Sequence, residues 1–187
     1  MRLREIYDAV LGAPWVYDRL RPLLLGGFDF AAVYAWLEVG PEDVVLDVGC
    51  GTGHALDHLT TFRAYHGFDP DERALARIRA TRRVAGVELY ARAVTGADVD
   101  DLGPTVVVLM GLLHHLSDRE AVALLADLAR AGQLKRVVTL DPVRVPGAWA
   151  NNLLRALDRG GFVRTEAGYR ALLAGFPPRN VRSIPTD

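Results

Sequence analysis

The sequence predicts an α/β protein with a doubly wound, mostly parallel β-sheet. The first observation is a series of five short apolar runs that alternate with helical patterns along the chain. The second is a glycine-rich turn, Gly49 to Gly53, which follows the first of these runs directly. The third is that acidic residues, Asp69 and Asp141, end two later runs. Right-handed crossovers between such strands place the first strand centrally, with a ligand over the carboxyl ends of the strands.

Composition indicates one globular domain over residues 1–187, because half of the residues are apolar. The net charge of −1 gives no bulk attraction to nucleic acid or to an anionic membrane. The longest apolar run, Val106 to Leu113, is too short to span a bilayer. Glu5 and Asp8 interrupt the N-terminus, so no secretory signal is visible and we expect a cytoplasmic protein.

Residues 1–39 precede the first strand and are predicted to form helices that are separated by prolines and glycines. Asp29 is placed to cap the last of its helices. Residues 40–187 form the predicted α/β core. The three predicted helices are Arg2 to Leu11, Trp15 to Leu25 and Phe28 to Val39.

The strand VVLDV, Val44 to Val48, breaks into the turn GCGTG. Missing side chains let the backbone approach a ligand, and the helical pattern that follows from His54 offers free N–H groups. The glycines read G-x-G-x-G, whereas a dinucleotide fingerprint reads G-x-G-x-x-G. Asp47 precedes the first glycine by two residues, and Asp69 ends the next strand, where an acid can bond ribose hydroxyls.

The predicted helix after the turn buries Leu56, Leu59 and Phe62. His54 and His58 lie four residues apart on it, a spacing that can hold a metal. No third ligand stands at a recognisable distance, so we predict no metal site. Cys50, the single cysteine, lies inside the turn and is interpreted as a small turn residue rather than a nucleophile.

Three further strands and two helices complete the predicted fold before residue 141. A helix opens at Asp69-Pro70-Asp71-Glu72, with Leu75, Ile78 and Ala85 inward. A second helix opens at Ser117, whose capping box is closed by Glu120, and runs to about Ala131 with Val122, Leu125 and Leu128 inward. The third, fourth and fifth strands are predicted at Val87 to Tyr90, Val106 to Met110 and Arg136 to Leu140.

Beyond Asp141 the pattern is looser. It predicts helices over Trp149 to Leu157 and Thr165 to Leu173, and a sixth strand that begins over Val181 to Ile184.

This constellation resembles the class I S-adenosylmethionine-dependent methyltransferases. Asp47 to Gly53 matches their first motif and Asp69 their second. Leu113 to Asp118, LHHLSD, resembles the motif after the fourth strand of small-molecule methyltransferases, and Asp158 to Tyr169 resembles one bacterial subgroup. The resemblance implies a Rossmann-like methyltransferase fold that transfers a methyl group from S-adenosylmethionine to an oxygen or nitrogen of a small molecule, with S-adenosylhomocysteine as product.

The resemblance also implies roles for particular residues. Residues 1–39 would form a helical lid over the cofactor, with Tyr17 as a contact. The remaining cofactor contacts would come from the glycine turn, from the second strand tip and from backbone groups near the adenine and amino groups. These residues are Asp47, Gly49, Cys50, Gly51, Asp69, Pro70, Ala93, Val94 and Met110.

His114, His115 and Asp141 lie at the carboxyl ends of the fourth and fifth strands and are the candidate catalytic residues. Histidine titrates near neutral pH and can accept a proton from a hydroxyl or amine. We expect His115 to be the better placed, because the leucines around the pair look core-facing. The alternatives are packed histidines that support the loop, and an Asp141 that serves only the turn before Pro142.

Three departures from the family pattern stand out. Ala93 occupies the position where the family has an acid near the adenine amino group, and Thr105 replaces an acid common before the fourth strand. The sequence stops at Asp187, about where a closing antiparallel hairpin is expected, so we predict that this hairpin is abbreviated or missing. An exposed sheet edge would favour a homo-oligomer.

Two other functions stay open on the sequence alone. A nicotinamide-dependent oxidoreductase is disfavoured by the glycine spacing. A catalytically silent, methyltransferase-like binding or scaffold subunit is favoured by the missing acid at Ala93 and by the short C-terminus.

Overall fold

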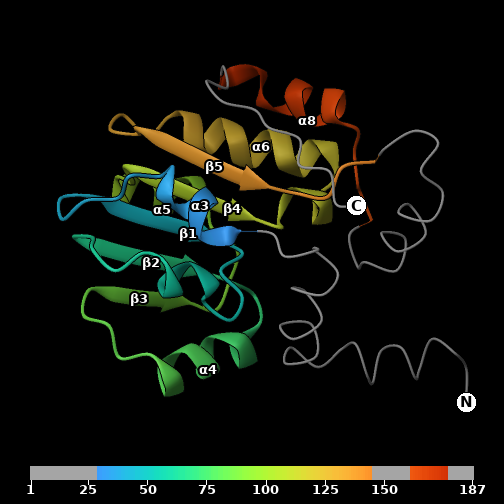
Figure 1. Cartoon of the computed structure of the whole chain (residues 1–187). Coiled ribbons are helices and arrows are strands. Elements are labelled where there is room, and N and C mark those ends of the chain that lie inside the picture. Colours follow the sequence, from blue (N-terminus) through green and yellow to red (C-terminus); the bar gives the residue numbers. More distant parts are fainter. Residues whose placement is uncertain (1–28, 145–160, 177–187) are drawn as a thin grey trace, which may run out of the picture.

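The computed structural model of the chain describes residues 29–144 and 161–176. In these residues one parallel sheet of five strands has the order β3-β2-β1-β4-β5 (Figure 1). The predicted doubly wound fold and the central position of the first strand are confirmed. The strands are β1 Val44–Val48, β2 Ala64–Phe68, β3 Val87–Tyr90, β4 Val106–Met110 and β5 Arg136–Leu140.

The central strand β1 is buried at all of its five positions. It pairs with β2 from Val44↔Ala64 to Val48↔Phe68, and with β4 from Val45↔Val106 to Asp47↔Val108. An apolar strand with no exposed face is typical of a parallel sheet covered by helices on both sides.

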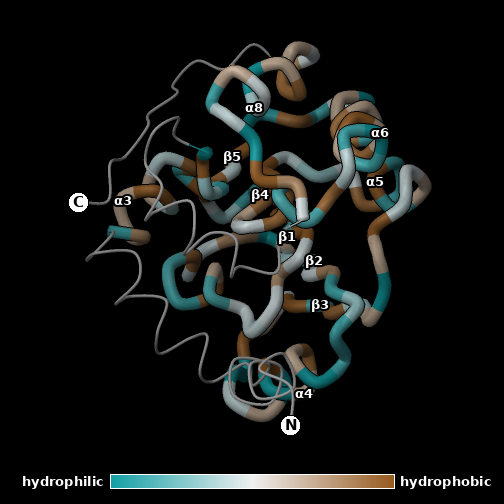
Figure 2. The backbone as a smooth tube through the Cα atoms, turned by 90° about the vertical axis from the view of Figure 1, so that its right-hand side faces the viewer, coloured by the Kyte–Doolittle hydropathy of each residue, from teal (hydrophilic) through white to brown (hydrophobic). Residues whose placement is uncertain are grey.

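Helices cover both faces of the sheet, as Figure 2 shows with α3 on one side and α5 and α6 on the other. Alternate residues of β1 point to opposite faces, so Val45 packs with α3 and α4 while Leu46 packs with α5, α6 and α8. The helices are α3 Phe30–Ala35, α4 Glu72–Thr81, α5 Gly96–Leu102, α6 Asp118–Ala129 and α8 Glu166–Leu172.

The predicted helix caps are confirmed. The Asp29 side chain accepts from the Ala32 N–H at 3.1 Å and starts α3, which ends at Ala35, earlier than predicted. Ser117 and Glu120 form the capping box of α6, with the Glu120 carboxylate 2.8 Å from the Ser117 nitrogen. Such a box satisfies two backbone donors that a helix start otherwise leaves without partners.

Several local predictions are wrong for identifiable reasons. The helix after the glycine turn is only a 3-10 turn, η1 His54–Asp57, although Leu56 and Leu59 are buried as expected. Val122 is 52% exposed, because Ala121, Leu125 and Leu128 define the inner stripe of α6 and Val122 falls beside that stripe.

The end of α4 and the whole of α5 also differ from the prediction. Ala85 is exposed, since α4 already ends at Thr81. Helix α5 was not predicted, and it buries only Val99 on the sheet. Its capping box of Thr95 and Asp98 is the sequence signal that indicates it.

Thr105 joins the amino ends of β1 and β4, at the edge opposite the glycine turn. Its hydroxyl donates to Asp43 at 2.8 Å and accepts from the Val44 N–H at 3.0 Å. Lys135 donates to the same Asp43 carboxylate at 2.7 Å, and this bond holds the pKa of Asp43 down at about 2. Thr105, which stands where the resembled family has an acid, therefore stabilises the amino edge of the sheet.

Some predictions lie outside the described residues: Tyr17, the first two predicted helices, the helix over Trp149 to Leu157 and the strand over Val181 to Ile184. None of the helices within 29–144 and 161–176 has the length and hydropathy needed to cross a membrane.

Candidate functional site

The carboxyl edge of the sheet gathers residues from four strand ends. All pairings in the sheet are parallel, so β1, β2, β4 and β5 finish at the same edge. The glycine turn follows β1, Asp69 follows β2, a histidine turn at 111–116 follows β4 and Asp141 follows β5. This edge is where ligands of open α/β sheets bind.

The three glycines of the turn have positive φ angles of 74°, 52° and 78°, a region that favours glycine. A Cβ atom on Gly49 would lie 3.0 Å from Leu112, and one on Gly53 would lie 2.9 Å from Ile78. A Cβ atom on Gly51 would meet nothing within 4 Å. Gly49 and Gly53 therefore pack against the protein, whereas Gly51 presents bare backbone to open space, where a ligand can approach.

Asp69 lies directly against the glycine turn. One carboxylate oxygen accepts from the Gly51 N–H and the other from the Asp71 N–H, each at 2.8 Å. The side chain is partly exposed, and Pro70 after it is exposed. The structure thus brings together two predicted cofactor-binding residues that are separated by 18 positions in the sequence.

Asp47 is buried behind the turn, with 3% of its surface exposed. The Tyr65 hydroxyl donates to its carboxylate. Gly67 stands opposite Asp47 in the β1–β2 register, and a Cβ atom on Gly67 would lie 3.1 Å from the Tyr65 ring, so the missing side chain gives the ring room. Burial raises the pKa of Asp47 to about 7, and the hydrogen bond from Tyr65 opposes part of this shift.

Cys50 is also buried, and burial raises the pKa of its thiol well above the ordinary range. A thiol that stays protonated is a poor nucleophile, in keeping with a turn residue.

The ends of β2 and β3 carry an aromatic pair that was not predicted from the sequence. Phe68 and Tyr90 stack with ring centroids 4.3 Å apart, and the Arg92 guanidinium lies 5.1 Å from the Phe68 ring. Arg92 also donates to the carbonyl of Ala93, which is exposed, while Val94 is half-buried. Aromatic residues at the ends of two predicted neighbouring strands are the sequence signal that could have predicted this stack.

The two histidines of the turn η2 Leu113–His115 have different environments. His114 is 2% exposed, and both its backbone N–H and its Nδ1 lie within 3.1 Å of the same Asp141 oxygen. Thr139 donates to the other Asp141 oxygen at 2.6 Å. His115 is exposed, with its ring centroid 4.1 Å from that of His114. His114 and Asp141 therefore form a buried pair, and His115 is the accessible histidine.

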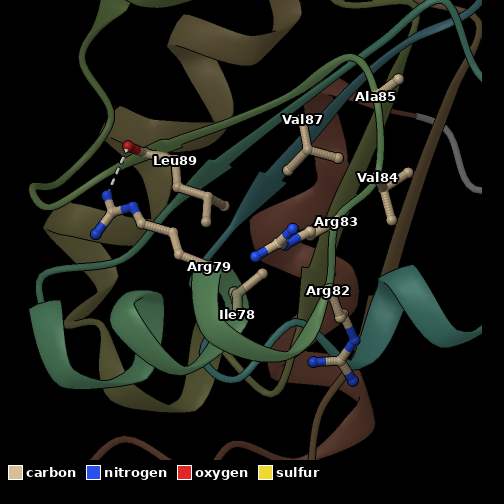
Figure 3. Close-up of a pocket in the computed structure, with 8 residues that line it drawn as sticks. All are labelled: Ile78, Arg79, Arg82, Arg83, Val84, Ala85, Val87 and Leu89. Carbon is tan, nitrogen blue, oxygen red and sulfur yellow. Dashed lines mark hydrogen bonds between the residues drawn. The ribbon is translucent and has the colours of Figure 1, made fainter.

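A shallow hollow of about 410 Å³ lies between α4 and β3 (Figure 3). Its polar groups are arginines, of which Arg79 donates to the Leu89 carbonyl and Arg82 binds Asp57. It contains none of the predicted site residues. Its lining consists of Ile78, Arg79, Arg82, Arg83, Val84, Ala85, Val87 and Leu89.

The raised pKa of Asp47 predicts a pH dependence of stability. The folded protein binds this proton more tightly than the unfolded chain, whose group titrates near 3.8. The stability contributed by protonated Asp47 is therefore full below about pH 4 and is lost as the pH rises to about 7, by at most about 1.4 kcal/mol per pH unit. Urea denaturation of Asp47→Asn across this range should lack that decline.

The matched control is Asp127→Asn, which removes an acid from α6 that is paired with Arg130 near the surface. It should keep the wild-type slope between pH 4 and 7. Parallel profiles for the wild type and Asp47→Asn would contradict a buried, protonated Asp47.

Comparison with known proteins agrees with this geometry. The family described as "Methyltransferase domain" matches residues 45–134. The ubiquinone biosynthesis O-methyltransferase of Rhizobium leguminosarum bv. trifolii is 32% identical over 124 residues, which cover 62% of this chain and 49% of the relative. That of Agrobacterium fabrum is 30% identical over 124 residues, which cover 62% of this chain and 50% of the relative. The chain spans about half the length of the curated relatives it matches.

Solved structures share the fold. CalO1, a methyltransferase of calicheamicin biosynthesis solved with S-adenosylhomocysteine bound, has a TM-score of 0.61 at 19% identity. The match covers 93% of this chain and 54% of the CalO1 chain. Human N-acetylserotonin methyltransferase, solved with S-adenosylmethionine, has a TM-score of 0.62 at 14% identity. The match covers 93% of this chain and 53% of the human enzyme's chain. Residues 45–134 are therefore similar to the methyltransferase-domain family, and the described sheet has the fold of solved methyltransferases that bind S-adenosylmethionine or S-adenosylhomocysteine.

Proposed function

We propose that this chain transfers the methyl group of S-adenosylmethionine to a hydroxyl group of a small molecule. The observation that carries the proposal is the meeting of Asp69 and the open backbone of Gly51 at one sheet edge, which also bears the exposed His115. The hydroxyl acceptor is inferred from curated relatives named O-methyltransferases. The similarity of residues 45–134 to the methyltransferase-domain family argues against a nicotinamide-dependent oxidoreductase.

The residues at the edge fit this cofactor. Asp69 offers carboxylate oxygens to the ribose hydroxyls, and Gly51 leaves space for close approach of the backbone. Asp47 lies behind the turn as a group that a positively charged amino group would ionise. We assign the remaining contacts to Gly49, Cys50, Pro70, Ala93, Val94 and Met110, and one to Tyr17, which lies outside the described residues.

In the proposed mechanism the cofactor supplies an electrophilic methyl group that is displaced in line by the acceptor oxygen. His115 takes the acceptor's proton, since it is the histidine of the pair that solvent and substrate can reach. His114 and Asp141 form a buried pair that supports the turn carrying His115, and both remain candidate catalytic residues in this proposal.

The predicted division of the chain is kept as part of the proposal. Residues 1–187 act as one domain, and the segment before the first strand closes over the site. Its last part is already packed on the core, because Tyr34 and Leu37 of residues 29–39 are buried. Residues 1–28 of the predicted lid, 1–39, lie outside the described residues. A cytoplasmic location and self-association through a sheet edge remain predictions from the sequence.

The cofactor site is tested by Asp69→Ala. Loss of hydrogen bonds to a charged group should weaken binding of S-adenosylhomocysteine by on the order of 1.5–3 kcal/mol, measured by calorimetry. Asp100→Ala is the control, since this acid lies on α5 with 57% of its side chain exposed. Unchanged affinity in Asp69→Ala would remove Asp69 from the cofactor site.

The reaction is tested by measuring S-adenosylhomocysteine release with a panel of small hydroxyl, amine and carboxylate compounds. With the best acceptor, His115→Ala should lower kcat roughly 10²–10⁴-fold while cofactor affinity stays nearly constant. The pH profile of kcat should also lose its limb near neutral pH.

Two outcomes would count against parts of this proposal. An acceptor that is methylated at nearly the wild-type rate by His115→Ala would withdraw the base role and leave the methyltransferase assignment standing. Cofactor binding without turnover on any compound would favour the alternative, a catalytically silent binding or scaffold subunit.

A further inference from the structure

Arg164 reaches from the segment before α8 into the histidine turn. Only 10% of its side chain is exposed. One terminal nitrogen donates to the Leu113 carbonyl and the other to the Leu116 carbonyl, each at 2.7 Å. Its Nε donates to Asp118 at 2.8 Å, and its guanidinium carbon lies 5.8 Å from the centre of the Tyr169 ring.

The backbone around Arg164 is tied to the same edge of the sheet. The Phe162 N–H donates to the carbonyl of His114 at 3.0 Å. The Arg164 carbonyl accepts from the N–H of Arg144, which follows β5, at 2.8 Å. The segment therefore bridges the chain after β4 and the chain after β5.

The two carbonyls bound by Arg164 lie on either side of His114 and His115. A planar guanidinium presents its donors in a fixed fork, so one side chain can set the relative position of two carbonyls. The N–H and ring of His114 are held from the opposite direction by Asp141. The turn is thus fixed by hydrogen bonds before and after His115, while the His115 side chain stays exposed.

The ion pair with Asp118 contributes less to this arrangement than the carbonyl contacts do. Asp118 has 83% of its side chain exposed, and exposed ion pairs contribute little. The carbonyl contacts are the partly buried ones, and a charged donor strengthens them.

We propose that Arg164 is a positioning residue that fixes the direction in which His115 points from the carboxyl edge of the sheet. This inference rests on the proposed function, in which His115 accepts the acceptor's proton. Arg164 does not contact the reacting atoms; it acts through the turn that it binds.

The first test needs no acceptor. The chain has 5 histidines, so their ring proton resonances can be followed by NMR, with His115→Gln assigning the His115 signal. In Arg164→Ala the His115 resonance should shift or broaden, while that of His66, which lies on β2, stays in place. Arg164→Lys keeps the charge without the fork and should show the same change, and it replaces Arg164→Ala if that variant fails to fold.

Two variants serve as matched controls. Arg170→Ala removes an arginine of α8 that binds Glu166 at the surface, and Asp118→Asn removes the exposed ion pair with Arg164. Both should leave the His115 resonance unchanged. A lowered melting temperature in Arg164→Ala with an unmoved His115 resonance would overturn the proposal and leave Arg164 as a structural anchor.

The second test uses the acceptor found by the release assay. Arg164→Lys should lower kcat roughly 10- to 100-fold, since small misplacements of a reacting group have effects of this size, and should shift the neutral limb of the kcat profile. The KM for S-adenosylmethionine should change less than about twofold. An unchanged kcat and pH limb would overturn the positioning role. If no acceptor is found, the proposed function fails while the NMR test still decides whether Arg164 orients His115.

Discussion

The burial of β1 on both faces is the constraint on which the rest of the structure depends. A strand with helices on either side must be apolar along its length, and its neighbours β2 and β4 run parallel to it. Parallel strands end at one edge, so whatever follows each strand is brought to the same place. The glycine turn, Asp69 and the histidine turn meet there although they are far apart in the sequence.

Two carboxylates at opposite edges of the sheet show how the surroundings set their roles. Asp43, at the amino edge, is hydrogen-bonded to Lys135, which holds its pKa at about 2. Asp47, at the carboxyl edge, is buried with the neutral hydroxyl of Tyr65, and its pKa is raised to about 7. The first carboxylate is already compensated by the fold. The second would gain from a positively charged ligand, which agrees with a site for a cofactor that carries an amino group.

The sequence was sufficient for the fold and for the glycine turn, because apolar periodicity and glycine spacing are local signals. It predicted the wrong side of α6 for Val122, and it missed α5, whose only residue buried on the sheet is Val99. It favoured His115 over His114 from the leucines around the pair, but it could not predict that the buried His114 pairs with Asp141, 27 residues away. The contacts of Tyr65 with Asp47 and of Arg164 with the turn also depend on strand register and tertiary packing, which no local pattern encodes.

The proposed cofactor site is the edge formed by Gly51 and Asp69. A crystal structure of the protein with S-adenosylhomocysteine would show whether the ligand binds there. We expect ribose hydroxyls within hydrogen-bonding distance of the Asp69 carboxylate, with the ligand lying over the bare backbone of Gly51. Density for the ligand in the arginine-lined hollow between α4 and β3, or anywhere away from the glycine turn, would show that Gly51 and Asp69 do not form the cofactor site.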